Sequence, residues 1–263
     1  MSGATDLSIG SLVAAFALLS IPIAFSITLK LGIVRESIIA SIRMGVQLFL
    51  AGLYLTWLFK INNPALNIIW ILFMMLVASL TTVQKSDLRP RYLLGPVCVA
   101  TFVATIGVVL YFNGFIARVD RLFEARYLVV IGGMVLGNSL HGNIVSLTHF
   151  YSALRDREER FLYFLGNGAT LQEAVRPFFR ESMIRALKPT LASMATIGLV
   201  ALPGMMTGQM LGGSDPLVAI KYQIAIMLTI FSSVTVSTAL AIYLSSRSAF
   251  DRYGILRPKI FRD

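Results

Sequence analysis

Residues 148–188 read THFYSALRDREERFLYFLGNGATLQEAVRPFFRESMIRALK. This is the one extended charged stretch in a chain that otherwise consists of long apolar runs. Charged side chains are costly in the hydrocarbon of a bilayer and remain hydrated outside it. The stretch is therefore predicted to be a polar loop, on the cytoplasmic side, between two groups of membrane-spanning helices.

A helix start is predicted within this loop. Thr170 and Glu173 have the three-residue spacing of a capping box, in which each side chain binds a backbone N–H at the other's position. In the residues that follow, apolar and polar side chains recur with the spacing that places them on opposite faces of an amphipathic helix. Because proline fits the first turn of a helix but not its interior, we predict a short helix ending at Arg176 and a second helix beginning at Pro177.

The composition indicates an integral membrane protein. The chain has 263 residues, of which 56% are hydrophobic and only 14% are charged, and its mean hydropathy is +0.76. These values lie outside the range of soluble globular proteins. The net charge of +10 comes from Lys and Arg between the apolar runs. In a protein that lies in the lipid bilayer, such basic residues indicate the topology of the chain, so no nucleic-acid site is predicted.

About seven apolar runs are long enough to cross a bilayer as helices, which takes roughly 20 residues. The predicted fold is an all-α polytopic membrane protein with a single transmembrane domain over residues 1–263. The predicted spans are about 8–29, 37–59, 65–84, 92–112, 127–147, 189–211 and 217–246, with the polar loop at 148–188.

Basic residues predict the orientation. The loops on one face, together with the C-terminal tail, carry 17 Lys and Arg, whereas the opposite loops carry four. Because basic residues are enriched on the cytoplasmic side, we expect a multi-pass protein of the cell membrane with its N-terminus outside and its C-terminus in the cytoplasm.

Two polar residues in the fifth predicted span are candidates for a substrate path. Asn138 and His141 lie at membrane depth, where polar side chains usually face a protein interior or a pathway. They either contact substrate or make a satisfied contact between helices. Met205, Met206 and Gln209 in the sixth span and Asp215 after it are further candidates.

The methionines have two interpretations, as thioether ligands of a transition metal or as adaptable residues that fill gaps at a moving interface. Asp215 before Pro216 is either the N-cap of the last helix or part of an outward-facing ion site. No metal-binding set is assigned from the sequence.

The sixth predicted span also contains a glycine strip, defined as Gly204, Gly208 and Gly212. Glycines that repeat every four residues allow another helix to approach closely. Pro203 is expected to bend the helix before the strip.

The sequence gives no support for an enzyme. None of the six lysines follows a glycine, so the Gly-x-x-x-x-Gly-Lys phosphate-binding loop is missing from this sequence. No catalytic residues and no cofactor are predicted for this chain, and any ATP that drives it is expected on another subunit as Mg-ATP.

Several separated stretches resemble one family, the FetB-type permeases. These are the membrane half of a bacterial iron-export ABC transporter, and plant relatives are half-transporters linked to aluminium tolerance. The similar stretches are Arg43 with Gln47-Leu48, Gly133-Met134 with Gly137-Asn138, Gly168-Ala169-Thr170, Gly198 to Met206, Asp215-Pro216 and Ile220 to Ile224.

The resemblance implies a homodimer of permeases bound to two ABC ATPase subunits, with metal ions, iron among them, as cargo. It implies that the helix after Thr170 couples the permease to the ATPase, through Gly168, Ala169, Thr170, Glu173 and Arg176. Two alternatives remain open, namely that this helix lies on the lipid surface, or that the chain is a partner-free secondary transporter or channel with a polar path through the fifth span.

Overall fold

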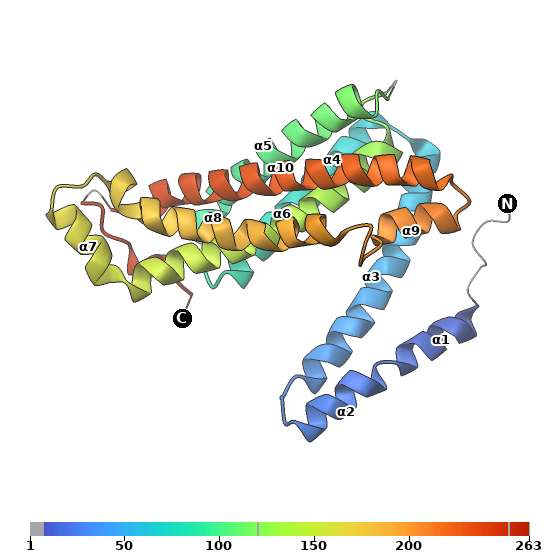
Figure 1. The fold of residues 1–263 in the computed structure, drawn as a ribbon, viewed down its shortest axis with the longest axis horizontal. Helices are drawn as coiled ribbons and strands as arrows, with labels where there is room; N and C mark the ends of the chain where they lie inside the picture. Colours follow the sequence, from blue (N-terminus) through green and yellow to red (C-terminus); the bar gives the residue numbers. More distant parts are fainter. Residues whose placement is uncertain (1–7, 120, 252, 263) are drawn as a thin grey trace.

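The protein is a bundle of long helices with a separate N-terminal arm (Figure 1). The computed structural model describes residues 8–119, 121–251 and 253–262, and the named elements within them are helices. The predicted all-α membrane fold is confirmed.

The helices follow one another along the chain with short connections. They are α1 (Ile9–Ala17), α2 (Ser20–Thr28), α3 (Val34–Ile61), α4 (Pro64–Lys85), α5 (Pro90–Tyr111), the π-helical turn η1 (Phe112–Ile116), α6 (Ala125–Asp156), α7 (Glu158–Gly166), α8 (Leu171–Thr196), α9 (Gly204–Leu211), α10 (Pro216–Ala249) and the 3-10 turn η2 (Pro258–Ile260).

The starts of α4 and α10 are fixed by a cap followed by proline. The Asn63 side chain accepts the backbone N–H of Ala65 at 2.9 Å, and that of Asp215 accepts the N–H of Leu217 at 2.8 Å. Proline fits at the position after each cap, because the backbone N–H that it lacks would have no hydrogen-bond partner in the first turn of a helix. Asp215 is therefore the N-cap of α10, as one of its two interpretations predicted.

The bundle core is formed by α4, α5, α6, α8 and α10. One buried cluster lies toward the α7 end and includes Leu147, Phe150, Phe161, Phe178 and Ile242. A second lies toward the other end and includes Ile71, Val109, Leu128, Val135 and Ile230.

Helices α6 and α10 run parallel and share a ladder of buried polar side chains. The hydroxyls of Ser139 and Ser233 lie 3.1 Å apart, and the Asn143 amide donates to Ser237 at 2.8 Å. The Tyr151 hydroxyl donates to Ser245 at 2.8 Å. Every rung joins residues 94 positions apart, which two helices can maintain only when they run in the same direction.

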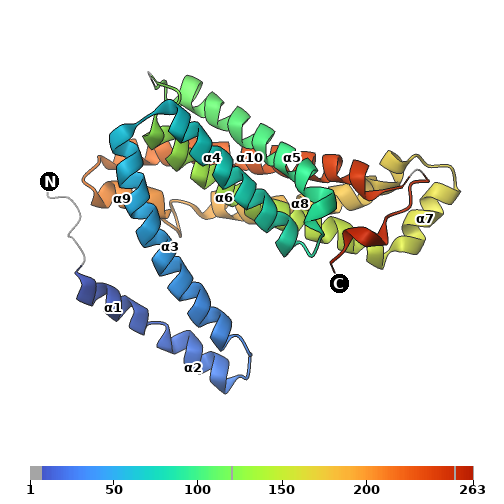
Figure 2. The ribbon, with the colours of Figure 1, turned by 180° about the vertical axis from the view of Figure 1, so that it is seen from behind.

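The arm consists of α1, α2 and most of α3, and it stands away from the bundle in both Figure 1 and Figure 2. It is attached at the C-terminal end of α3, where Leu58 is buried against Ala125 and Val129. None of the most apolar window of α3 is buried inside the chain. These apolar side chains are thus left for lipid or for another protein subunit.

Six of the predicted spans are present as helical segments of the described chain that are long and apolar enough to cross a membrane. Five of them correspond to predicted spans as α3, α4, α5 with η1, α6 and α10, and the first predicted span is divided into α1 and α2.

The predicted sixth span at 189–211 is wrong as a single helix. Its first part belongs to α8, which ends at Thr196, and its last part is α9. Pro203 does not bend a continuous helix, because it is the N-cap residue of α9. A residue in the left-handed conformation, Gly198 with φ of 85°, lies in the break.

The predicted helix boundary at Pro177 is also wrong, since α8 continues through both Pro177 and Pro189. Ala174 and Phe178 on either side of Pro177 are buried. An interior proline costs a helix roughly 3 kcal/mol, and burial of the flanking apolar face offsets this cost. Residues 148–165, in the first part of the predicted polar loop, are helical and are divided between α6 and α7 at Arg157.

Candidate functional site

The break between α8 and α9 lines a cavity. The carbonyl of Thr196 accepts the N–H groups of Leu199 and Val200 at 3.3 and 3.0 Å, which turns the chain out of α8. Helix α9 begins five residues after Leu199, at Gly204. Irregular backbone at membrane depth is tolerated where it lines a cavity or packs against protein.

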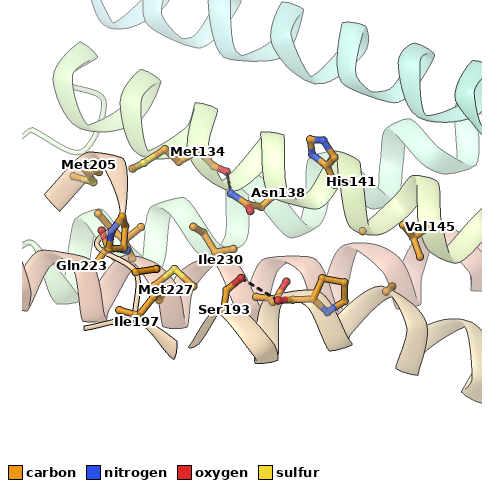
Figure 3. A pocket seen from close by; sticks show the side chains of 17 residues that line it. Met134, Asn138, His141, Val145, Ser193, Ile197, Met205, Gln223, Met227 and Ile230 are labelled. Atoms are coloured by element: carbon orange, nitrogen blue, oxygen red, sulfur yellow. Dashed lines mark hydrogen bonds between the residues drawn. The ribbon is translucent and has the colours of Figure 1, made fainter. Parts of the chain in front are cut away.

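The cavity has a volume of about 470 Å³ and lies between α6, α8, α9 and α10 (Figure 3). Its lining combines apolar side chains with a few polar ones. The lining residues on which the chemistry depends are Met134, Asn138 and His141 of α6, Ser193 of α8, Met205 of α9, and Gln223 and Met227 of α10.

The polar side chains of α6 and α8 are held by their own helices. The Asn138 amide donates to the carbonyl of Met134 at 2.8 Å. The His141 Nδ1 lies 2.8 Å from the carbonyl of Gly137, and the Ser193 hydroxyl donates to that of Pro189 at 3.0 Å. A carbonyl only accepts, so His141 has its hydrogen on Nδ1 when neutral.

Gln223 is the most deeply placed polar residue of the lining. Its side chain is 5% exposed and its Oε1 has no hydrogen-bond partner in the described structure. A buried unpaired acceptor is costly. Such a group in a cavity wall is therefore a candidate ligand contact.

The cavity contains only part of the substrate path predicted from the sequence. Asn138, His141 and Met205 line it, whereas Met206 is buried beside it. Gln209 and Asp215 are not among its lining residues.

Three lining residues, Met134, Gln223 and Met227, were missed by the sequence analysis. Met134 precedes Asn138 by four residues and Gln223 precedes Met227 by four, so each pair lies on one helical face. That spacing is a signal that could have identified them once the break in the sixth span was known.

The second candidate site is the tip of the bundle, defined here as α7 and the turn to α8 (Figure 1). Thr170 accepts the N–H of Glu173 at 3.3 Å, and Glu173 accepts the N–H of Thr170 at 2.8 Å. The predicted capping box is therefore present. The Thr170 N–H and the Thr170 hydroxyl both donate to the Glu173 carboxylate at 2.8 Å, and these two bonds lower the pKa of Glu173 below its ordinary value.

The turn before the capping box contains Gly168 in the left-handed conformation, with φ of 85°, where other residues are strained. On α7, Tyr163 is 68% exposed and Leu162 is 41% exposed. Glu158 and Glu159 occupy its first turn. The tip thus presents exposed apolar and acidic side chains on a short helix that the sequence analysis did not separate from α6.

Glu181 connects the tip to α8. Arg157 donates to Glu181 at 2.7 Å, and Arg185 lies 3.8 Å from the same carboxylate. The hydrogen bond from Arg157 lowers the pKa of Glu181. Behind it, His149 lies 2.9 Å from the Ser182 hydroxyl, so α6, α7 and α8 meet at one ion-pair cluster.

Within the described residues, no group of three or more His, Cys, Asp or Glu could hold a metal ion. A resident metal centre built from those ligand types is not found in that part of the chain.

Comparison with known proteins gives the family. The model of the uncharacterised protein family UPF0014 matches residues 9–250. The UPF0014 membrane protein YjkA of Bacillus subtilis (strain 168) is 32% identical over 222 residues, covering 84% of this chain and 87% of that protein.

Two further relatives have names that refer to metals. The protein ALUMINUM SENSITIVE 3 of Arabidopsis thaliana is 30% identical over 250 residues, covering 94% of this chain and 89% of that protein. The "Probable iron export permease protein FetB" of Escherichia coli (strain K12) is 28% identical over 242 residues, covering 92% of each. No solved structure gives a significant match. The chain belongs to the UPF0014 family of membrane proteins.

Proposed function

We propose that the chain is the permease subunit of an ABC-type exporter of metal ions, with iron as the cargo suggested by the name of the Escherichia coli relative. The observation that carries the proposal is the cavity at the break between α8 and α9. Transporters bind their cargo where spanning helices are interrupted near the middle of the membrane.

The energy would come from a second protein. This sequence has no phosphate-binding loop, so Mg-ATP would be bound by a separate ATPase subunit. The tip has the features that docking requires, because Leu162 and Tyr163 are exposed on a short helix beside the rigid turn at Gly168.

The tip is mechanically joined to the cavity. Helix α8 begins at the capping box and ends at Thr196, beside the cavity. A push on its start would therefore act on the wall formed by Pro189 and Ser193. In this mechanism ATP-driven closure of the partner moves α8 and opens the cavity to alternate sides. Two permeases and two ATPases would form the complete complex.

The proposal is tested by purifying the tagged chain from a host that also expresses the candidate ATPase. We expect the two to co-purify, and we expect iron to stimulate ATP hydrolysis in proteoliposomes. Metal transport by the chain alone, with no ATPase bound and no dependence on ATP, would contradict the proposal and indicate the partner-free transporter instead.

A further inference from the structure

The polar groups of the cavity offer lone pairs to a ligand. Asn138, His141 and Ser193 each place a hydrogen toward a carbonyl of their own helix. What remains for a ligand is the Asn138 Oδ1 with the second N–H of that amide, the His141 Nε2 and the lone pairs of the Ser193 hydroxyl.

Gln223 adds an acceptor for which the described residues supply no donor. Its side chain is buried and lines the cavity, and its Oε1 has no hydrogen-bond partner in the described structure. A buried acceptor of this kind is satisfied either by a donor or by a cation.

Three thioethers surround this end of the cavity. Figure 3 shows Met134, Met205 and Met227 at the same end as Gln223, while Val145 lies at the opposite end. These side chains come from α6, α9 and α10. A thioether sulfur accepts but does not donate, so it adds to the acceptor character of the wall.

The lining contains no Asp, Glu, Lys or Arg among its described residues. Hard cations such as Mg²⁺ bind through carboxylates and retain water, whereas thioethers select soft cations such as Cu(I). A multiply charged ion would also lack a counter-charge in a region of low dielectric constant. The donor set therefore discriminates by softness and by charge.

Met134, Met205 and Met227 pack against the second buried cluster of the bundle, but they differ in burial from the neighbouring Met206. Met206 follows Met205 in α9 and is 5% exposed, as a methionine that fills a gap in the core should be. Met134, Met205 and Met227 are instead half-buried on the cavity wall.

Building on the transport function proposed above, we propose that Gln223, Met134, Met205 and Met227 form a cargo site for a soft transition-metal cation of low charge. The site binds the dehydrated ion through neutral thioether and amide oxygen donors.

The test is titration calorimetry of Ag(I), a soft cation stable in air, against the purified full-length chain in detergent. Cys98→Ser serves as the background, because the Cys98 thiol would also bind silver. The variants are Gln223→Leu, Met205→Leu and Met227→Leu. The matched control is Met206→Leu, and exchange of Met for Leu conserves volume.

We expect saturable binding of one Ag(I) per chain in the background protein and in the control. Affinity should fall at least tenfold in each of the three variants, and excess Mg²⁺ should not displace the ion. Thermal unfolding checks the fold, and Gln223→Leu should be no less stable, because it removes an unpaired buried oxygen.

No saturable binding to the background protein, displacement by Mg²⁺, or unchanged affinity in all three variants would overturn the site. The outcome is separable from the proposed function, since binding is measured without ATPase or nucleotide. A chain that binds Ag(I) as expected but recruits no ATPase would contradict the ABC assignment and still support the metal site. A chain that recruits an ATPase but does not bind Ag(I) would support the ABC assignment and contradict the metal site.

Discussion

Thr170 and Glu173 show which single residues the sequence alone can place. Their capping box depends only on spacing along the chain, and both of its bonds are present. The same is true of Asp215 as the N-cap of α10. Gln223 could not be recognised, because its significance depends on contacts that form only when α6, α8, α9 and α10 assemble around the cavity.

The capping box provides the first prediction. Thr170→Ala should destabilise the start of α8 by about 1 kcal/mol. Glu173→Lys removes the carboxylate that accepts the Thr170 N–H. We expect the double variant to be expressed and inserted normally but to lose ATPase co-purification or cargo-stimulated hydrolysis. A helix lying on lipid would tolerate the added positive charge near anionic headgroups.

The control is Gln172→Lys, which also introduces a lysine at an exposed neighbouring position but leaves the capping box intact. Full ATPase binding and turnover in the double variant, equal to that of the control, would show that this helix start is not the coupling element.

The ion pair of Glu181 with Arg157 predicts a pH dependence. The pKa of Glu181 is lowered from an ordinary value of 4.5, so its stabilising effect is present above pH 4.5 and is lost as the pH falls through the lower folded-state value. The two side chains are 40% and 37% exposed, so solvent screening limits the effect to less than about 1 kcal/mol.

We expect Glu181→Gln to lower the Tm of the purified protein at pH 7, and this difference to shrink below pH 4.5. The exposed Glu158→Gln should show no such convergence. A difference that stays constant across the acidic range would mean that the ionised carboxylate does not stabilise the junction of α6, α7 and α8.

At the scale of elements, the sequence predicted the helices that are uniformly apolar and missed the interruptions. Most ends of helices α3 to α6 and α10 lie within a few residues of the predicted span ends, because the length of an apolar run directly indicates a membrane-spanning helix. The continuation of α8 through Pro177 was not predictable, since it depends on burial of Ala174 and Phe178. The break at residues 197–203 was hidden by an apolar run, and Leu199 within it is 90% exposed.

The α6–α10 ladder predicts that two glycines of one helix respond differently. A Cβ at Gly142 would lie 2.6 Å from the Val234 side chain, whereas one at Gly137 would meet nothing within 4 Å. We expect Gly142→Ala to destabilise the protein by about 1–3 kcal/mol through overpacking. Gly137→Ala should be neutral or stabilising, because alanine is the better helix former. Thermal unfolding of both variants measures this, and equal effects would contradict the close contact of the two helices.

The glycine strip predicts self-association. A Cβ at Gly204 or Gly208 would meet no described atom within 4 Å, so no helix in the described part of the chain covers these two positions. If a second permease covers them, Gly204→Leu or Gly208→Leu should weaken the dimer and reduce transport. Light scattering in detergent and cross-linking in membranes measure the dimer, with Gly107→Leu, at an uncovered glycine of α5, as the control. Unchanged association in both strip variants would place the strip against lipid.

For the whole molecule, the composition alone identifies a polytopic membrane protein, but it does not determine how the helices are arranged. The detached arm of α1 to α3 is as apolar as the bundle helices, so no property of its sequence distinguishes a helix facing lipid from one facing protein. Its attachment depends on tertiary contacts at the end of α3, where Leu58 is buried against Ala125 and Val129 and Tyr54 packs on Trp70.

The orientation in the membrane remains a prediction, and the structure provides two positions at which to test it. Ser214, in the turn between α9 and α10, and Asn167, in the turn between α7 and α8, are exposed at opposite ends of the bundle (Figure 1). The 17 to four distribution of basic residues places the Asn167 end in the cytoplasm. In a Cys98→Ser background, Ser214→Cys should react in intact cells with a membrane-impermeant maleimide, and Asn167→Cys should react only after permeabilisation. Labelling of Asn167→Cys alone in intact cells would invert the topology and place the tip beyond the reach of a cytoplasmic ATPase. Labelling of both would mean that the bundle does not span the membrane along its long axis.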